Sequence, residues 1–197
     1  MENKIFENKF FTFINPGLSL IDRGELYKKP FQWLYIVIAV VNLLVPLFVL
    51  YAAIDFGIFK QEAKYIFAFL FIWLVIAIAG WVSFQIWWNR KDKITHTSQE
   101  NSDFPATPVI SHLIQTSGEC FGAWIAIVGF GFAFFGTIFL GEQQASGFAY
   151  ALKLPLVEGG ILTMILMPVY GFLTIVFARF IAELIRALAC IANNTKK

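Results

Sequence analysis

Three residues before a long apolar stretch carry groups that could do chemistry. His112, Glu119 and Cys120 supply the imidazole, carboxylate and thiol of a metal site, or of a nucleophile with its base. On a helix His112 and Glu119 share one face, but their separation of about 10 Å is too great for shared ligation without another element. No HExxH, CxxC or phosphate-binding glycine loop accompanies them. We therefore predict no catalytic residue, metal site or cofactor, and interpret His112 as a solvated residue at the membrane interface.

A second group of ionisable residues lies near the C terminus. Arg179, Glu183 and Arg186 are spaced at i, i+4 and i+7, which places them on one face of a helix. Charges at membrane depth often mark function. However, the twenty residues from Gly159 to Ala178 are uncharged and cross a hydrocarbon core on their own, so Arg179 falls at the inner interface. We predict an ion-pair face or a subunit contact, with an inner gate or ion path as the alternative.

The opposite face of the same helix is apolar. Its spacing of 4, 3, 4 and 3 residues is that of a heptad seam, which predicts packing against another helix. We call these residues the heptad seam: Phe177, Ile181, Leu184, Leu188 and Ile191.

Small residues recur along the third apolar stretch and predict a close approach of helix backbones. The segment Gly129-Phe130-Gly131-Phe132 leaves a pore lining as the alternative, if several copies surround an axis. We call this set the small-residue seam: Gly118, Gly122, Ala126, Gly129, Ala133 and Gly136.

Composition defines the class of protein that must position these residues. The chain is 58% hydrophobic and only 14% charged, which indicates an integral membrane protein. The net charge of +2 is small and its basic residues are scattered, which argues against a nucleic-acid partner. Cys120 and Cys190 are expected to be free thiols on the inner side.

We predict an all-α polytopic membrane protein, a four-transmembrane-helix bundle with an amphipathic N-terminal arm over residues 1–30. In that arm Phe6, Phe10 and Phe13 form an apolar stripe that suits the membrane interface or packs on the bundle. Asn42, inside the first span, is expected to bond another helix. Residues 141–157 are expected to be an outer loop with a small amphipathic turn. The transmembrane domain, 31–197, is predicted to have spans at about 31–53, 65–88, 120–140 and 159–178, the last continuing into the cytoplasm to about 194.

Orientation follows from the basic residues that flank the spans. The N-terminal arm, the middle loop and the C-terminal segment hold 5, 3 and 4 Lys and Arg residues, twelve in all, whereas the other two loops hold 2 and 1, three in all. Because cytoplasmic loops are rich in Lys and Arg, we predict cytoplasmic N and C termini.

The end of the chain resembles a family of small bacterial membrane proteins that is defined as a domain of unknown function. In that family the last span ends in an Arg, a Glu follows one turn later, and the helix closes on an Asn-containing tail. The matching residues are Arg179, Glu183 and Asn193 or Asn194, within the last forty residues or so. The resemblance implies a bacterial inner-membrane protein and no particular activity.

Two seams on two helices are more than one bundle needs. We therefore predict a non-enzymatic inner-membrane protein whose partners are the lipid bilayer and either further copies of itself or another membrane or cytoplasmic subunit. The alternative is a channel or transporter for ions or a small solute, lined by the glycine-rich third helix. An enzyme acting on lipid lacks a convergent acid, base and nucleophile.

Overall fold

The described part of the chain is helical throughout. The computed structural model describes residues 29–94, 106–142, 147–154 and 160–195. It contains the long helices α3 (Lys29–Asp55), α4 (Ala63–Arg90), α6 (Ala106–Leu140) and α9 (Gly160–Thr195), with a short helix α8 (Gly147–Ala151) and a 3-10 turn at Ile58–Lys60. The four long helices are long and apolar enough to cross a membrane. The prediction of an all-α chain with four such helices is confirmed, whereas the N-terminal arm lies outside the described residues.

Two of the long helices extend well beyond the apolar spans predicted for them. α6 starts at Ala106, fourteen residues before the span predicted from Cys120, and is one continuous helix to Leu140. α9 is also continuous from Gly160 to Thr195, and Pro168 lies inside it without ending it. A helix of 36 residues is about 54 Å long at 1.5 Å per residue, longer than the hydrocarbon core needs. Both helices are therefore longer than a membrane crossing requires.

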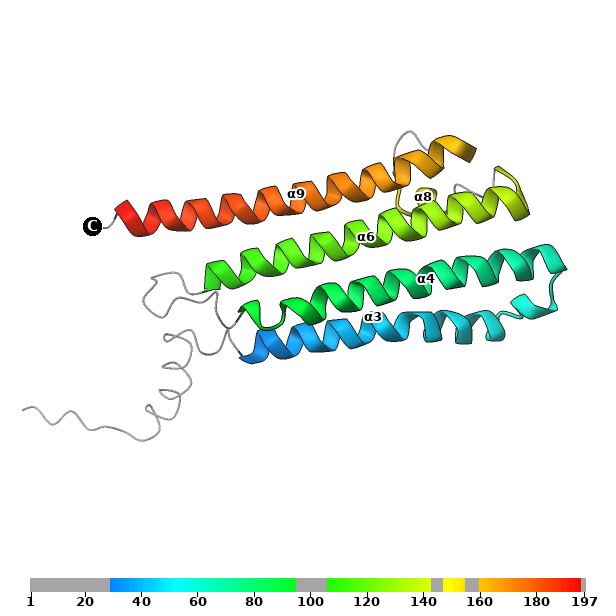
Figure 1. Cartoon of the computed structure of the whole chain (residues 1–197), viewed down its shortest axis with the longest axis horizontal. Coiled ribbons are helices and arrows are strands. Elements are labelled where there is room, and N and C mark those ends of the chain that lie inside the picture. The colour runs from blue at the N-terminus through cyan, green and yellow to red at the C-terminus, as the bar shows by residue number, and fades with distance from the viewer. Residues whose placement is uncertain (1–28, 95–105, 143–146, 155–159, 196–197) are drawn as a thin grey trace, which may run out of the picture.

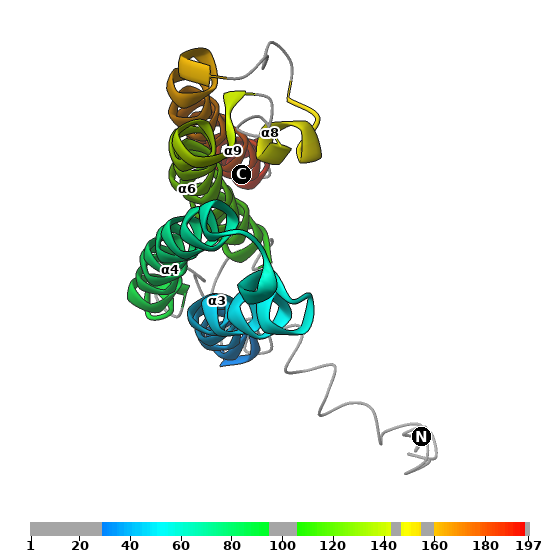
Figure 2. The ribbon, with the colours of Figure 1, turned by 90° about the vertical axis from the view of Figure 1, so that its right-hand side faces the viewer.

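The long helices form an open row in the order α3, α4, α6, α9 (Figure 1). Among the described helices, extensive contacts join α3 to α4, α4 to α6 and α6 to α9. Seen along the helices, the row is curved, and α3 and α9 stand at its two ends (Figure 2). A bundle was expected, in which the first and last helices also meet. The row instead leaves much of α3 and α9 without a neighbour, and their apolar windows are the least buried of the four.

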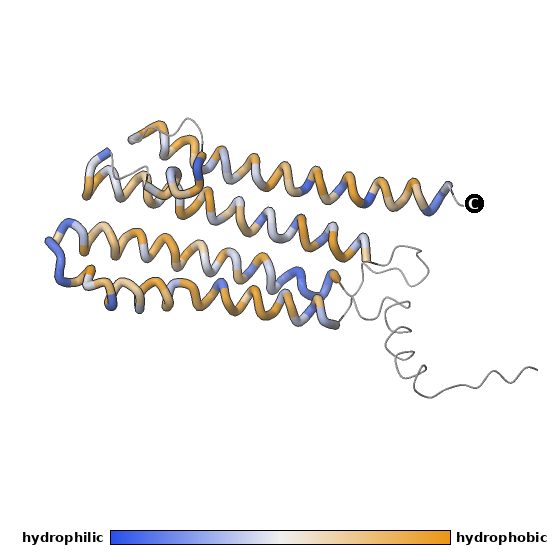
Figure 3. The backbone as a smooth tube through the Cα atoms, turned by 180° about the vertical axis from the view of Figure 1, so that it is seen from behind, coloured by the Kyte–Doolittle hydropathy of each residue, from blue (hydrophilic) through white to orange (hydrophobic). Residues whose placement is uncertain are grey.

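Hydrophilic segments gather where the helices begin and end, at the two opposite ends of the molecule along the helix axes (Figure 3). We call one end the arginine end, because α4 finishes there at Arg90 and α9 passes Arg179 and Arg186. α3 and α6 also begin at this end, and the C terminus lies beyond it. The other end is the hairpin end, where Gly57 connects α3 to α4 with a positive φ of 69°.

The small-residue seam of α6 lies mostly against α9. A Cβ on Gly118 would stand 1.9 Å from Cβ of Ala178, and one on Gly122 would stand 2.5 Å from the carbonyl oxygen of Gly171. Real Cβ atoms do not approach so closely, so only glycine permits this spacing of the two backbones. Gly131 instead meets Val75 of α4. Glycine therefore brings α6 close to both of its neighbours.

The short helix α8 packs against the middle of α6 and the second turn of α9, although its segment was expected to be an outer loop with a small amphipathic turn. Ala149 is buried in a cluster with Ile125 of α6 and Met167 of α9. Phe148 stacks on Phe132 with 5.4 Å between ring centroids. Ile125 and Phe132 lie within the apolar part of α6, so the chain returns into the helix layer after α6 ends. Leu152 and Leu154, which flank Lys153, are partly buried against the same cluster and help to hold this segment on α6 and α9.

Candidate functional site: a charged cluster joining the helices

A buried carboxylate lies at the centre of the arginine end. Glu119 of α6 has a side chain that is 8% exposed, and its Oε2 forms an ion pair with Nη2 of Arg90 from α4. Its Oε1 accepts a hydrogen bond of 2.8 Å from Nε of Arg179 on α9 and another of 3.1 Å from Nε2 of Gln115. Both carboxylate oxygens are thus occupied, and one side chain ties α4, α6 and α9 together. Hydrogen bonds between ionised groups are roughly twice as strong as hydrogen bonds between neutral groups.

The cluster carries more positive than negative charge. Arg186, two turns beyond Arg179, donates from Nη2 to Oε1 of Gln115 at 3.0 Å and from Nε to the carbonyl of Ala182. Gln115 therefore connects a third guanidinium group to Glu119. Two arginines contact Glu119 and a third is joined to it through Gln115, and the excess positive charge lies at the end of the helices where the sequence predicts the cytoplasm.

A neutral network continues from the cluster to α3. The Tyr35 hydroxyl donates to Oγ1 of Thr116 at 3.3 Å and lies 2.9 Å from Nδ1 of His112. Oγ1 of Thr116 donates in turn to the carbonyl of His112 and accepts from Nη1 of Arg90 at 3.4 Å. The Tyr35 hydroxyl therefore bridges Thr116 and His112. The polar side chains at the arginine end thus link all four long helices.

The predicted ion-pair face of α9 is divided between two environments. Arg179 and Arg186 turn towards α6, where Glu119 and Gln115 receive them. Glu183 is exposed, and no ion pair is recorded for it among the described residues. The partner of Arg179 is therefore a residue of another helix instead of the glutamate one turn away.

The heptad seam of α9 is largely uncovered within the chain. Ile181 is half-buried, and the other four members are exposed, Leu188 by 59%. α9 instead packs on α6 through small residues, of which Gly171, Ala178 and Ala182 are buried. This choice of face leaves most of the seam's large side chains exposed, although Leu188 also lines a small pocket with Thr107 of α6.

His112, Glu119 and Cys120, which were considered for chemistry, each contact a different partner and form no common site. His112 bonds Tyr35, Glu119 binds arginines, and Sγ of Cys120 lies 3.9 Å from Oδ1 of Asn42. Within the described ranges, no three His, Cys, Asp or Glu residues gather as metal ligands would. A carboxylate held by two guanidinium groups is poorly placed to act as a base, and it serves here to fix helices relative to one another.

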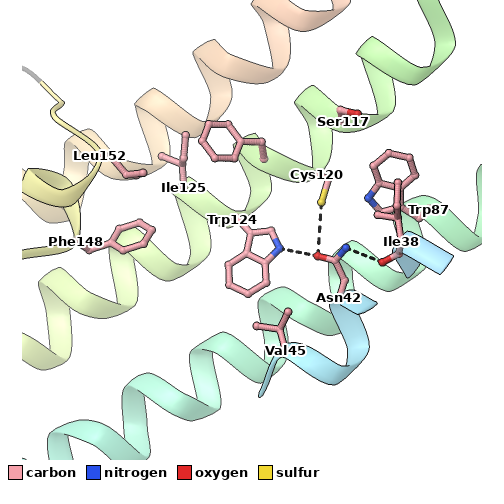
Figure 4. Close-up of a pocket in the computed structure, with 11 residues that line it drawn as sticks. Ile38, Asn42, Val45, Trp87, Ser117, Cys120, Trp124, Ile125, Phe148 and Leu152 are labelled. Carbon is pink, nitrogen blue, oxygen red and sulfur yellow. Dashed lines mark hydrogen bonds between the residues drawn. The ribbon is translucent and has the colours of Figure 1, made fainter. Parts of the chain in front are cut away.

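A lateral groove of about 440 Å³ separates α3 from α6 (Figure 4). Asn42 stands in it and accepts a hydrogen bond of 3.2 Å from Nε1 of Trp124, which confirms the predicted bond from Asn42 to another helix. The amide of Asn42 donates back to the carbonyl of Ile38. Most of the side chains that line the groove are apolar or aromatic. The full lining is Ile38, Asn42, Val45, Trp87, Ser117, Cys120, Phe121, Trp124, Ile125, Phe148 and Leu152.

Sequence reasoning named Glu119 but missed its partners. Neither Arg90, which lies just past the second predicted span, nor Tyr35 was singled out. A signal was present, since Arg90, Glu119 and Arg179 all stand at the same boundary of their predicted spans. Comparing the depth of charged residues in different predicted spans would have indicated that these three side chains lie close together.

No protein-family model, curated protein or solved structure matches the chain. The resemblance of the C-terminal helix to a family of bacterial membrane proteins gains no support from these comparisons.

Proposed function

We propose that this chain is a multi-pass membrane protein that works as a subunit of a larger assembly and carries no catalysis of its own. The four apolar helices support the membrane location. Twelve basic residues flank the spans on the side of the arginine end and three on the other, which favours a cytoplasmic arginine end. The resemblance of the last helix points to the bacterial inner membrane.

The observation that carries the assembly is the exposed heptad seam. Arg179 and its partner Glu119 mark the expected membrane boundary. Leu184, Leu188 and Ile191 lie beyond it and are exposed. Ile191 is twelve residues past Arg179, or about 18 Å at 1.5 Å per residue, so lipid does not cover this part of the seam. A contiguous apolar strip in water marks a contact with protein.

A second copy of the chain is the partner that fits this strip best. Copies inserted in one membrane share an orientation, so two α9 helices run parallel about a two-fold axis. A heptad seam is self-complementary in that arrangement, because each apolar side chain meets its counterpart. α9 stands at the end of the helix row, where nothing in the described chain obstructs such an approach.

The test compares two neighbouring residues of α9 that face different ways. In Leu188→Asp a charge enters the proposed interface, and we expect the oligomer measured by light scattering in mild detergent to dissociate. In Arg186→Ala an exposed side chain is lost, and the oligomer should persist. A wild-type protein that is strictly monomeric and co-purifies with no partner would overturn the proposal. Equal effects of the two substitutions would contradict the assignment of faces.

The channel alternative needs the glycines of α6 to face water. Gly118 and Gly122 lie against α9, Gly129 meets Met167 of α9, and Gly131 meets Val75 of α4. These contacts favour a packing role for the glycines, so the structure offers no observation that favours a pore.

A further inference from the structure

The groove between α3 and α6 contains a hydrogen-bond donor that the protein leaves unused. Trp87 is 3% exposed, yet its indole Nε1 has no hydrogen-bond partner in the part of the chain that the structure describes. The ring is held edge-on against Tyr35, with 4.7 Å between centroids. Figure 4 shows the indole nitrogen on the side of the ring that faces Cys120 and Asn42. A buried donor of this kind calls for an acceptor, because leaving it unpaired is unfavourable.

The rest of the groove is suited to a chain of hydrocarbon. Val45, Phe121, Ile125, Phe148 and Leu152 line it, and its volume of about 440 Å³ lies in the range of small-molecule sites. Two polar side chains besides Trp87 belong to the lining, Asn42 and Ser117, and Oδ1 of Asn42 already receives Nε1 of Trp124. The groove therefore offers a buried, unpaired indole donor, the hydroxyl of Ser117 and an otherwise apolar surface, which suits a molecule with a carbonyl group at one end of an alkyl chain.

The direction of the groove matches one leaflet of a bilayer. Trp87 lies one turn before Arg90, at the depth where the charged cluster begins. From Ser117 to Ile125 the lining follows α6 for eight residues, or about 12 Å at 1.5 Å per residue. Half of a hydrocarbon core is about 15 Å thick. α8 closes the far end with Phe148 and Leu152, close to mid-membrane.

We propose that the groove binds one phospholipid of the leaflet at the arginine end, with an acyl chain along α6 and an ester carbonyl accepting the hydrogen bond from Nε1 of Trp87. Ester carbonyls lie at the boundary between headgroups and hydrocarbon, which is the depth of Trp87. The alkyl chain then covers the apolar wall down to α8. This site rests on the membrane location proposed above but not on self-association.

The test uses two synthetic lipids that differ only in the carbonyl group. Protein stripped of lipid in detergent is incubated with a diester phosphatidylcholine or its diether analogue of equal chain length, and bound lipid is counted by native mass spectrometry. We expect one diester lipid per chain and a preference over the diether of about two- to tenfold, the range for one neutral hydrogen bond.

Three variants locate the site. Trp87→Phe keeps an aromatic ring against Tyr35 and should abolish the preference for the diester. Ser117→Phe places a ring in the groove and should lower the occupancy of both lipids. Trp88→Phe changes the neighbouring tryptophan, which does not line the groove, and should behave as the wild type.

Two results would overturn the site. One is equal binding of diester and diether lipids by the wild type, a comparison that depends on the folding of no variant. The other is an unchanged preference in Trp87→Phe protein whose helical circular dichroism equals that of the wild type. Lipid is counted per chain, so a monomer that retains the preference would refute self-association and leave this site standing.

Discussion

Replacing Glu119 with glutamine removes the one negative charge of the cluster without changing the shape of the side chain. Arg90, whose side chain is 18% exposed, would then stay enclosed without a counter-ion. Breaking a buried ion pair in this way costs about 3–5 kcal/mol. Arg90 keeps its bond to Thr116, so we expect the lower part of that range. Arg179 is 54% exposed and adds less than about 1 kcal/mol.

The free energy of unfolding can be measured by titrating mixed detergent micelles with sodium dodecyl sulfate and following helical circular dichroism. Glu119→Gln should lower it by about 3 kcal/mol, because a buried guanidinium group loses its partner. Arg179→Gln should lower it by less than about 1 kcal/mol, since Glu119 remains paired with Arg90. Glu183→Gln is the matched control on the same helix face and should stay within about 0.5 kcal/mol of the wild type.

Two outcomes would refute the pairing of Arg90 with Glu119 as the centre of the cluster. If Glu183→Gln were as costly as Glu119→Gln, an ion-pair ladder along α9 would explain the charges better. If Arg179→Gln cost as much as Glu119→Gln, the contact between α6 and α9 would be the dominant one. In either case the ion pair between Arg90 of α4 and Glu119 of α6 would not be the main contribution of the cluster to stability.

Three further predictions follow from packing, topology and the groove. Gly122→Ala should lower the free energy of unfolding by about 1–3 kcal/mol because the new methyl group meets the backbone of α9, whereas Gly147→Ala, with open space around it, should have little effect in the same titration. A membrane-impermeant maleimide should label the exposed Cys190 in inside-out vesicles and not in right-side-out vesicles, while the buried Cys120 stays unlabelled in both; labelling from the opposite side would reverse the topology. Asn42→Leu should cost about 0.6 kcal/mol, the usual value of a hydrogen bond between membrane helices, and a change of several kcal/mol would show that it also holds the groove together.

The long helices were predictable because their signal is local. An uninterrupted apolar segment such as Gly159–Ala178 has few alternatives to a helix in a membrane, where every backbone group must bond within its own segment. The spacing of Gly118 and Gly122 likewise predicts a close helix contact. The pattern of a single helix does not predict which neighbouring helix makes that contact.

The partner of Arg179 and the depth of α8 depend on distant parts of the chain. Glu183 stands at i+4 from Arg179 and is the natural partner within one helix, yet Glu119 lies sixty residues away and is far less exposed. A pair that excludes water is the stronger one. For α8, an outer loop with a small amphipathic turn was predicted over residues 141–157, but Ala149 is buried against Ile125 and Met167. Both outcomes follow from tertiary packing.

The open row of helices also bears on how the protein is made. Each long helix packs on the one before it, so α3 and α4 can pair while the ribosome is still translating the rest, and α9 needs only α6 when it emerges last. The hydrogen bonds that Tyr35 and Asn42 of α3 form with α6 follow once α6 has been synthesised. It follows that a gene cut between α4 and α6 should yield two hairpins able to recombine in the bilayer. Glu119 and Arg90, one on each half, would guide that reunion.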